Sequence, residues 1–256
     1  MSHKYGIVVQ ARCGSTRLPN KILLPICKKT VLEHIIRRLN RVKKSSILII
    51  ATTIEKKDLE ILKICFNLQT HVYCGSTNDV LDRYYQAARL FQLQNIIRIT
   101  SDCPLIDPQL VDQMILCHEK QKNDYSTNSQ PPTYPDGEDI EIMTYLTLKK
   151  TWQKAKLLSE REHVTSFIYK HPKLFSIFDF KNSVDLSNKR WTLDYPEDYK
   201  FIKKIYQGLY NIKPYFSISD IIKFIQKHPE LENINKYISR NIGYQKSLKL
   251  DKKVVI

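Results

Sequence analysis

A polar and basic segment near the start of the chain has the composition of a phosphate-binding loop. It has the sequence QARCGSTRLPNK and runs from Gln10 to Lys21. Glycine and small hydroxyl residues let backbone amides approach phosphate oxygens, and cations neutralise a triphosphate and its departing pyrophosphate. The order GxxxxGK[ST] of a P-loop is absent. On its own, a basic loop of this kind is more often a solvated surface loop than a binding site. Its position in the fold must therefore decide between these two interpretations. Its candidate residues are Arg12, Arg17 and Lys21, with Gly14, Ser15 and Thr16 between them.

Two aspartates elsewhere in the chain are candidate metal ligands. Asp102 lies in RITSDCPLID and Asp194 in RWTLDYPED, each just after a short apolar run. A carboxylate in such a place can hold Mg²⁺ against phosphate oxygens. Asp107 suits the N-cap of a helix starting at Pro108, and Asp102 lies too far upstream for that role. Asp194 fits either a cap or a metal ligand.

The elements that must position these residues alternate between strand and helix in the first half of the chain. Apolar runs at 5–9, 47–51, 71–73 and 96–99 predict strands. Helices are predicted between them, one opened by a capping box from Thr30 to Glu33. Strands that are apolar throughout indicate a parallel sheet covered on both faces. We therefore predict a three-layer α/β sandwich with a mainly parallel, Rossmann-like sheet, whose ligands bind beyond the carboxyl ends of the strands.

The second half of the chain is less regular. Strands are predicted at 140–143, 175–180 and 191–193, and a proline-rich loop at 129–137. The pattern favours a single domain over 1–245, followed by a tail or dimer arm over 246–256. Helices are predicted near 144–155, 160–171, 196–208 and 219–227.

The composition limits the function classes. The net charge of +15 permits a polyanionic partner, but the lysines are spread along all 256 residues, which favours no nucleic-acid partner. A non-enzymatic nucleic-acid binder stays as an alternative, and it would bind in a salt-sensitive way. The six cysteines form no CxxC pair, so we expect small buried side chains rather than zinc ligands or disulfides. No apolar run is long enough to span a membrane, and we expect a cytoplasmic protein without a membrane partner.

Three motifs together resemble those of a known enzyme family. QARCGSTRLPNK, RITSDCPLIDP and WTLDYPED occur in this order in the cytidylyltransferases that activate acidic sugars. The resemblance is greatest to the branch of the spore coat polysaccharide protein SpsF, related to the 3-deoxy-manno-octulosonate and acylneuraminate cytidylyltransferases. It continues through YCGSTNDVLDRYYQAA, PPTYPDGEDIE, SEREHVT and INKYISRNIGYQKSL, and so covers nearly the whole chain.

This resemblance implies a nucleotide-diphosphosugar-transferase fold, Mg²⁺ as cofactor and a homodimer. The implied reaction joins CTP and a sugar acid to give a CMP-sugar and pyrophosphate, for surface polysaccharide or glycoconjugate biosynthesis. Asp102 and Asp194 would bind Mg²⁺, and Lys21, Arg12, Arg17 and Asp102 would be catalytic. One departure is Ser101, where the family usually has glycine. The implied nucleotide-binding residues are Gln10, Ala11, Arg12, Gly14, Ser15, Arg17, Lys21 and Thr100.

The acceptor site is predicted within the resembling 131–165 stretch. Its candidates are Tyr134, Asp136, Glu141, Arg161 and His163. Arg161 could pair with a substrate carboxylate. His163 could act as a general base, and the alternative is a packed or surface histidine. The alternative is that 160–163 is only an exposed helix start.

A rival enzyme class on a related fold is a glycosyltransferase that consumes a nucleotide sugar. It also needs a metal carboxylate and a nucleotide pocket. It expels no pyrophosphate, so the basic first loop favours a triphosphate ligand.

Overall fold

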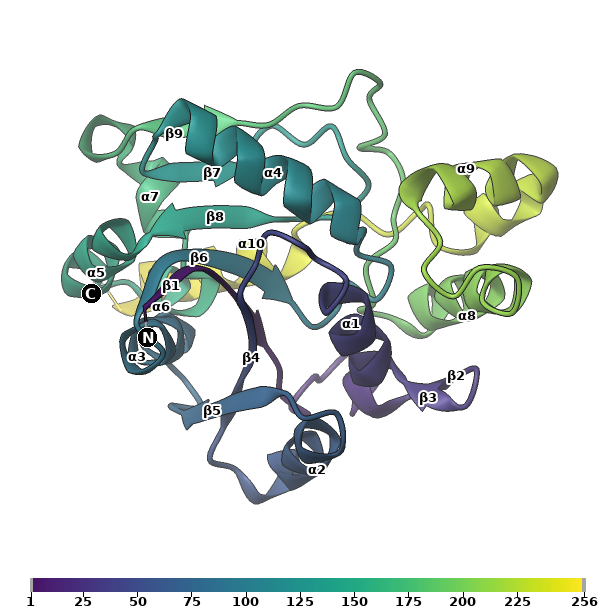
Figure 1. Ribbon diagram of the computed structural model, residues 1–256, viewed down its shortest axis with the longest axis horizontal. Helices are drawn as coiled ribbons and strands as arrows, with labels where there is room; N and C mark the ends of the chain where they lie inside the picture. Colours follow the sequence, from purple (N-terminus) through teal and green to yellow (C-terminus); the bar gives the residue numbers. More distant parts are fainter. Residues whose placement is uncertain (1, 255–256) are drawn as a thin grey trace.

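The computed structural model describes residues 2–254 and contains a seven-stranded sheet in the order β5-β4-β1-β6-β8-β7-β9 (Figure 1). Strands β5, β4, β1 and β6 are mutually parallel, whereas β8 pairs antiparallel with both β6 and β7. A separate short hairpin joins β2 to β3. The strands are β1 (His3–Gln10), β2 (Pro25–Ile26), β3 (Lys29–Thr30), β4 (Ile47–Thr53), β5 (His71–Gly75), β6 (Leu93–Thr100), β7 (Tyr125–Thr127), β8 (Glu141–Thr144) and β9 (Ile177–Asp179).

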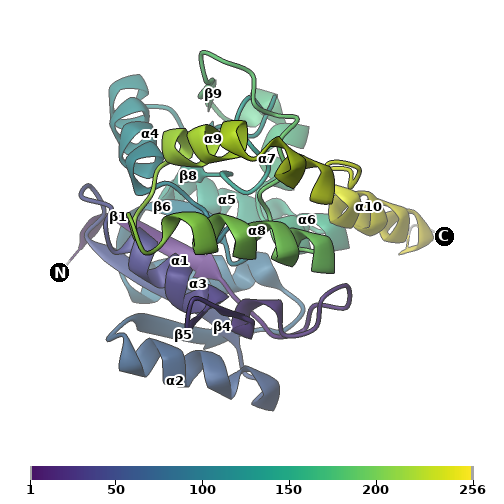
Figure 2. The same ribbon diagram turned by 90° about the vertical axis from the view of Figure 1, so that its right-hand side faces the viewer.

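Helices cover both faces of the sheet (Figure 1). One face carries α1, α2, α4, α8 and α9, and Figure 2 shows α8 and α9 side by side. The other carries α3, α5, α6 and α7, with α10 packed on α6. The helices are α1 (Val31–Leu39), α2 (Leu59–Asn67), α3 (Val80–Leu90), α4 (Pro108–Gln121), α5 (Tyr145–Lys154), α6 (Leu158–His163), α7 (Ser166–Lys170), α8 (Pro196–Leu209), α9 (Ile218–Lys227) and α10 (Ile242–Val254), with 3-10 turns η1 (Lys21–Leu23), η2 (Lys56–Asp58), η3 (Pro172–Leu174) and η4 (Pro229–Ile234).

The two faces explain why the central strands are apolar throughout. In β1, Ile7 and Val9 pack into the core under α1 and α8, whereas Val8 packs into the core under α3. All three side chains are fully buried. Successive strand residues point to opposite faces, so consecutive residues in the middle of a strand that is covered on both sides are all apolar. The predicted three-layer, mainly parallel fold is confirmed.

Two predicted helix caps are present. The hydroxyl of Thr30 accepts from the Glu33 amide at 3.2 Å, and the Glu33 carboxylate accepts from the Thr30 amide at 2.7 Å. Asp107 caps α4 by accepting from the Gln109 amide at 2.9 Å. These contacts satisfy first-turn amides that have no partner within the helix.

Two predicted elements differ from the structure. Residues 191–193 form no strand, because the Leu193 amide donates to the Asp102 carbonyl at 2.8 Å instead of pairing along a ladder. The helix predicted over 160–171 is two helices, α6 and α7. They are separated at Val164, whose φ of 58° is incompatible with a continuous right-handed helix.

The segment predicted as a tail from residue 246 belongs to the folded domain. It continues α10, which begins at Ile242 and runs to Val254. The Asp251 carboxylate accepts from the Ser159 amide of α6 at 3.0 Å. This contact anchors α10 to the domain, whereas the side chains of a free arm would be surrounded by water. Helix α10 therefore runs across the predicted boundary at residue 245, and residues 255–256 lie outside the described part of the chain.

Two composition-based expectations can be compared with the structure. All six cysteines are free, and Cys13, Cys65 and Cys103 are buried. Within residues 2–254, no helix is both long and apolar enough to cross a membrane.

Candidate active site

The basic loop and the first candidate aspartate meet at the carboxyl ends of β1 and β6. These strands are parallel neighbours, and their register places Gln10 beside Thr100. A cavity of about 390 Å³ opens there, which we call the nucleotide cavity. Every predicted nucleotide, catalytic and metal residue lines it, namely Gln10, Ala11, Arg12, Gly14, Ser15, Arg17, Lys21, Thr100, Asp102 and Asp194.

The basic loop is held in place by a buried acid. One Asp58 oxygen accepts from the Cys13 amide at 2.7 Å, and the other accepts from the Thr53 hydroxyl. Asn20 then takes the left-handed conformation with a φ of 54°, directly before the turn η1 that starts at Lys21. Asparagine tolerates this conformation better than most residues. This anchoring directs Lys21 into the cavity.

Lys21 lies between the two candidate metal ligands. Its ammonium donates to Asp102 Oδ2 at 3.0 Å, to Asp194 Oδ1 at 2.9 Å and to the Leu193 carbonyl at 2.8 Å. These contacts use all three ammonium donors, and Lys21 is only 9% exposed. Burial lowers the pKa of Lys21, but the two carboxylates outweigh it and the net pKa is raised. The lysine is therefore charged at neutral pH.

The Asp102 carboxylate is held in its ionised form. Burial would raise the pKa of Asp102, but the Lys21 ammonium and the Thr100 hydroxyl at 2.5 Å lower it to about 2. Arg17 approaches Asp194 Oδ1 to 2.6 Å. The carboxylates of Asp102 and Asp194 therefore face the same point in the cavity, and the Lys21 ammonium lies at that point.

Asp194 is not the N-cap of α8. Its carboxylate faces Lys21 and Arg17, whereas the backbone amides of Asp194 and Tyr195 donate to Asp198 at 2.9 and 3.0 Å. The fully buried Asp198 also accepts two hydrogen bonds from Arg190, both at 2.9 Å. The capping role thus belongs to Asp198, and Asp194 is left to face the cavity.

A second cavity of about 280 Å³ adjoins the first, and we call it the acceptor cavity. Three predicted acceptor residues line it: Asp136, Glu141 and His163. Its cations are paired with its acids, Arg98 with Glu141, Arg190 with Asp136, and Arg240 with Asp139. Burial and nearby Asp139 raise the pKa of Asp136 to about 7. The residues shared by both cavities are Gln10, Arg17, Thr100, Asp102, His163, Asp194 and Gly243.

The other two predicted acceptor residues lie elsewhere. Arg161 donates to the Asp79 carboxylate at 2.8 Å and to the Trp152 carbonyl at 2.7 Å, and it lines neither cavity. It ties α6 to the N-cap of α3, and the structure does not bring it together with the other acceptor candidates. Tyr134 also lies outside both cavities, because its ring stacks on Phe180.

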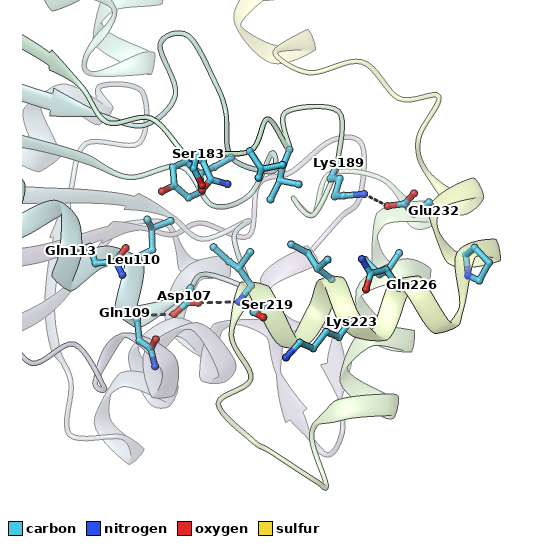
Figure 3. A pocket seen from close by; sticks show the side chains of 18 residues that line it. Asp107, Gln109, Leu110, Gln113, Ser183, Lys189, Ser219, Lys223, Gln226 and Glu232 are labelled. Atoms are coloured by element: carbon cyan, nitrogen blue, oxygen red, sulfur yellow. Dashed lines mark hydrogen bonds and ion pairs between the residues drawn. The ribbon is translucent and has the colours of Figure 1, made fainter.

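Tyr134 instead lines a separate cavity of about 960 Å³ between α4, α9 and the 182–189 loop (Figure 3). Its walls include the apolar side chains of Leu110, Ile218 and Ile222, and no residue of the basic loop. Asp107 lies at its edge, where its carboxylate is occupied by the amides of Gln109 and Ile218. Although Lys189, Lys223 and Glu232 also line this cavity, none of the predicted nucleotide-binding, catalytic or metal-binding residues does.

Arg83 is a cavity residue that the sequence analysis missed. It comes from α3, is 1% exposed and lines the nucleotide cavity. One terminal nitrogen donates to the Ala51 carbonyl at 3.2 Å, Nε has no hydrogen-bond partner, and no acid pairs with it among residues 2–254. Burial lowers its pKa. The sequence signal that could have identified Arg83 is its place beside Val80 and Tyr84, on the otherwise apolar face of the predicted helix.

The sequence profile of the family described as Cytidylyltransferase matches residues 6–222. The chain belongs to the cytidylyltransferase family. This membership indicates a nucleotidyltransferase enzyme. The alternative that the net charge left open was a non-enzymatic nucleic-acid binder. The match spans the basic loop and both aspartates, and the family predicted from the three motifs is confirmed.

Relatives of this cytidylyltransferase align along most of its length. The uncharacterized protein MJ1063 of Methanocaldococcus jannaschii is 36% identical over 235 residues, which cover 90% of this chain and 94% of that protein. The spore coat polysaccharide biosynthesis protein SpsF of Bacillus subtilis is 31% identical over 229 residues, covering 87% and 94%. The 3-deoxy-manno-octulosonate cytidylyltransferase of Marinobacter nauticus is 32% identical over 115 residues, covering 43% and 42%.

Solved structures share the fold. A cytidylyltransferase from Leptospira borgpetersenii superposes with a TM-score of 0.87 and 35% identity, covering 93% of this chain and 99% of that one. A CMP:2-keto-3-deoxy-manno-octonic acid synthetase complexed with CTP superposes with a TM-score of 0.63 at 16% identity, covering 80% and 99%. At that identity the second similarity concerns the fold alone.

Proposed function

We propose that this cytidylyltransferase transfers CMP from CTP to a hydroxyl of a sugar acid and releases pyrophosphate, for surface polysaccharide or glycoconjugate biosynthesis. The observation that carries the proposal is the contact of Lys21 with both Asp102 and Asp194, at the end of a loop rich in arginine. The nucleotide is suggested by membership of the cytidylyltransferase family, and the sugar acid is suggested by the Marinobacter nauticus enzyme. The homodimer and the cytoplasmic location stay predictions.

The two aspartates fit a magnesium ion. Mg²⁺ is usually held by one or two carboxylates together with substrate phosphates. Within the described residues no group of three histidine, cysteine or acidic side chains gathers as a metal cluster, which suits an ion completed by phosphate oxygens. Asp102 and Asp194 would hold it, and when bound it would offset charge on the reacting phosphate.

The protein's own cations have a separate task. Lys21, Arg17 and Arg12 line the nucleotide cavity and offset charge on the transferred group and the departing pyrophosphate. The two cavities meet at Asp102 and Asp194. We therefore place the α-phosphorus at this junction, the remaining nucleotide in the first cavity and the acceptor in the second.

The proposed acceptor is a sugar acid, and its carboxylate needs a cation to bind it. Arg161 lines neither cavity, so this cation must be another residue. The side chains of Arg98, Arg190 and Arg240 line the acceptor cavity and are 13%, 6% and 18% exposed. Arg240 is the most accessible, and it precedes α10 in a segment without regular structure. We therefore assign the acceptor carboxylate to Arg240.

A pyrophosphate-release screen tests the proposed reaction. Each of the four nucleoside triphosphates is combined with a panel of 2-keto-3-deoxy sugar acids, with and without Mg²⁺. We expect release only with CTP, a sugar acid and the metal. Release of a nucleoside diphosphate or monophosphate from a nucleotide sugar, without pyrophosphate release from CTP, would instead identify the glycosyltransferase alternative.

A second prediction concerns Arg83. Its Nε lies unpartnered at a cavity that is proposed to hold an anionic nucleotide. The variant Arg83→Met keeps the apolar stem and removes the donors, so we expect the KM for CTP to rise about 10-fold or more, the effect of losing a hydrogen bond to a charged group. Steady-state kinetics measure it. Exposed Arg89 on the same helix supplies the control Arg89→Met, and equal KM values for both variants would contradict the role of Arg83.

A further inference from the structure

His163 stands at the junction of the two cavities. It is among the residues that line both of them, and the other titratable members of that set are Arg17, Asp102 and Asp194. Those three are engaged in ion pairs with one another or with Lys21. Of the shared residues, His163 is the one whose neutral side chain is a proton acceptor of suitable strength near pH 7.

A hydrogen-bonded chain fixes the orientation of the imidazole. His163 Nε2 lies 3.0 Å from Ser247 Oγ, which lies 2.6 Å from Glu162 Oε2. A hydroxyl has a single proton, and the charged carboxylate at 2.6 Å attracts it more strongly than the Gly243 carbonyl at 3.3 Å. Ser247 Oγ therefore accepts from Nε2–H. This leaves the lone pair of the neutral ring on Nδ1, which has no hydrogen-bond partner within the described residues.

Strained backbone holds this histidine at the cavity wall. Val164 follows it with φ 58° and ψ −60°, and the Thr165 amide donates to the His163 carbonyl at 2.5 Å. This is the rarer, strained form of γ-turn, and a β-branched residue rarely adopts a positive φ. The Thr165 hydroxyl donates to Glu141 at 2.5 Å and so secures the turn. Such strain persists where the surroundings fix the geometry, often at functional sites.

The C-terminal helix α10 completes the arrangement. It supplies Ser247, and the Tyr244 ring packs edge-on against the imidazole with centroids 5.0 Å apart. Figure 2 shows α10 beside α6, the helix that ends at His163. The imidazole is thus held by groups from two helices, the arrangement expected for a base oriented by a third residue.

We propose that His163 is the general base of this enzyme, with Ser247 and Glu162 as its positioning residues. The inference rests on the proposed function. The acceptor's O–H bond breaks and its proton moves to Nδ1, while the acceptor oxygen forms a bond to the α-phosphorus. The bond from that phosphorus to the oxygen bridging to the β-phosphorus breaks, and pyrophosphate leaves with the electron pair.

The pH dependence follows from the surroundings of the imidazole. Burial lowers the pKa of His163 and Arg98 lowers it further, whereas Glu162, Glu141 and Asp251 raise it, and the net pKa lies below the usual value. The Tyr244 ring also faces it. The base is therefore neutral at pH 7, and we expect kcat to fall as the pH drops through this lowered pKa.

The test compares kcat of the wild type and His163→Asn at saturating CTP and acceptor, between about pH 5 and 9. We expect kcat to fall about 100-fold or more, the usual effect of losing a general base. The acidic limb should disappear, and the KM for CTP should stay within about threefold. Added imidazole should restore part of the activity. A folded His163→Asn variant that keeps kcat, or keeps the acidic limb, overturns the proposal.

Two further variants address the positioning residues. In Ser247→Ala the ring loses its partner, so we expect kcat to fall about 10-fold with a shifted acidic limb, and Ser247→Thr should restore it. His228→Asn is the matched control, because exposed His228 lies near a glutamate but outside both cavities. Unchanged kcat in Ser247→Ala would remove Ser247 from the assignment. If the wild type releases no pyrophosphate with any acceptor, the proposed function itself fails, whereas an active wild type with an equally active His163→Asn rejects only the base.

Discussion

Replacing Asp102 with asparagine is expected to lower kcat for pyrophosphate release by about 100-fold or more, the effect of removing a group that stabilises transition-state charge. Asparagine keeps the shape of the side chain and its contact with Thr100. It removes the negative charge that faces Lys21 and that would hold the metal. Lys21→Ala should have a similar effect for the opposite reason, because it removes the cation from the same point. The measurement is the rate of CTP-dependent pyrophosphate release with Mg²⁺ present.

The control for this experiment is Asp112→Asn. Asp112 accepts from the backbone amides of Lys43 and Lys44 near the surface and lines neither cavity of the site. We expect its kcat to remain within about twofold of the wild type, as for most surface substitutions. Pyrophosphate release that is unchanged in both Asp102→Asn and Lys21→Ala would refute the assignment of these residues to the reaction.

Replacing Arg190 with alanine is expected to lower the free energy of unfolding by about 3–5 kcal/mol, the usual cost of removing one partner of a buried ion pair. Asp198 is fully buried, and two of its hydrogen bonds come from Arg190. Without the arginine it keeps Asn235 and two backbone amides, but no cation. Because Asp198 also positions the Asp194 backbone, the loss should affect both fold and site. Urea unfolding monitored by circular dichroism measures it.

An exposed ion pair provides the comparison for Arg190. Lys63 and Glu60 pair on the surface of α2 with side chains 68% and 56% exposed. Pairs of this kind contribute at most a few tenths of a kcal/mol because water screens them, so Lys63→Ala should scarcely change the unfolding midpoint. If Arg190→Ala destabilises no more than Lys63→Ala, then Asp198 is not held as a buried charge.

The sequence by itself was sufficient for the central sheet and for one side of the site. Uniformly apolar runs predicted strands buried on both faces, and parallel neighbours necessarily bring their carboxyl ends to one edge. The loop after β1 and Asp102 after β6 therefore had to lie close together. The capping roles of Thr30 and Asp107 were also predictable, because a cap depends on residues only a few positions apart.

The sequence did not determine which polar residues of the second half face the cleft. Arg161 has the right type and lies within two residues of His163, but its guanidinium binds Asp79 of a distant segment. In the first half of the chain, Arg83 also lines the nucleotide cavity, but its only signal in the sequence was its place on the apolar face of a helix. Packing between segments far apart in the chain decides which cation pairs with which acid. Local periodicity predicts helices and strands but not these pairs.

The tertiary structure alone decided the role of the C-terminal segment. The sequence from residue 246 looks like a charged tail, yet residues 246–254 belong to helix α10, and Ser247 of this helix reaches His163, 84 positions away in the chain. Likewise, Lys21 contacts Asp194 across 173 positions. Short-range patterns therefore determined the elements and the chemistry available at their ends. Which distant residues meet in the site was decided by burial and charge pairing between segments far apart in the chain. These interactions form only once the chain has folded, so the sequence pattern does not reveal them.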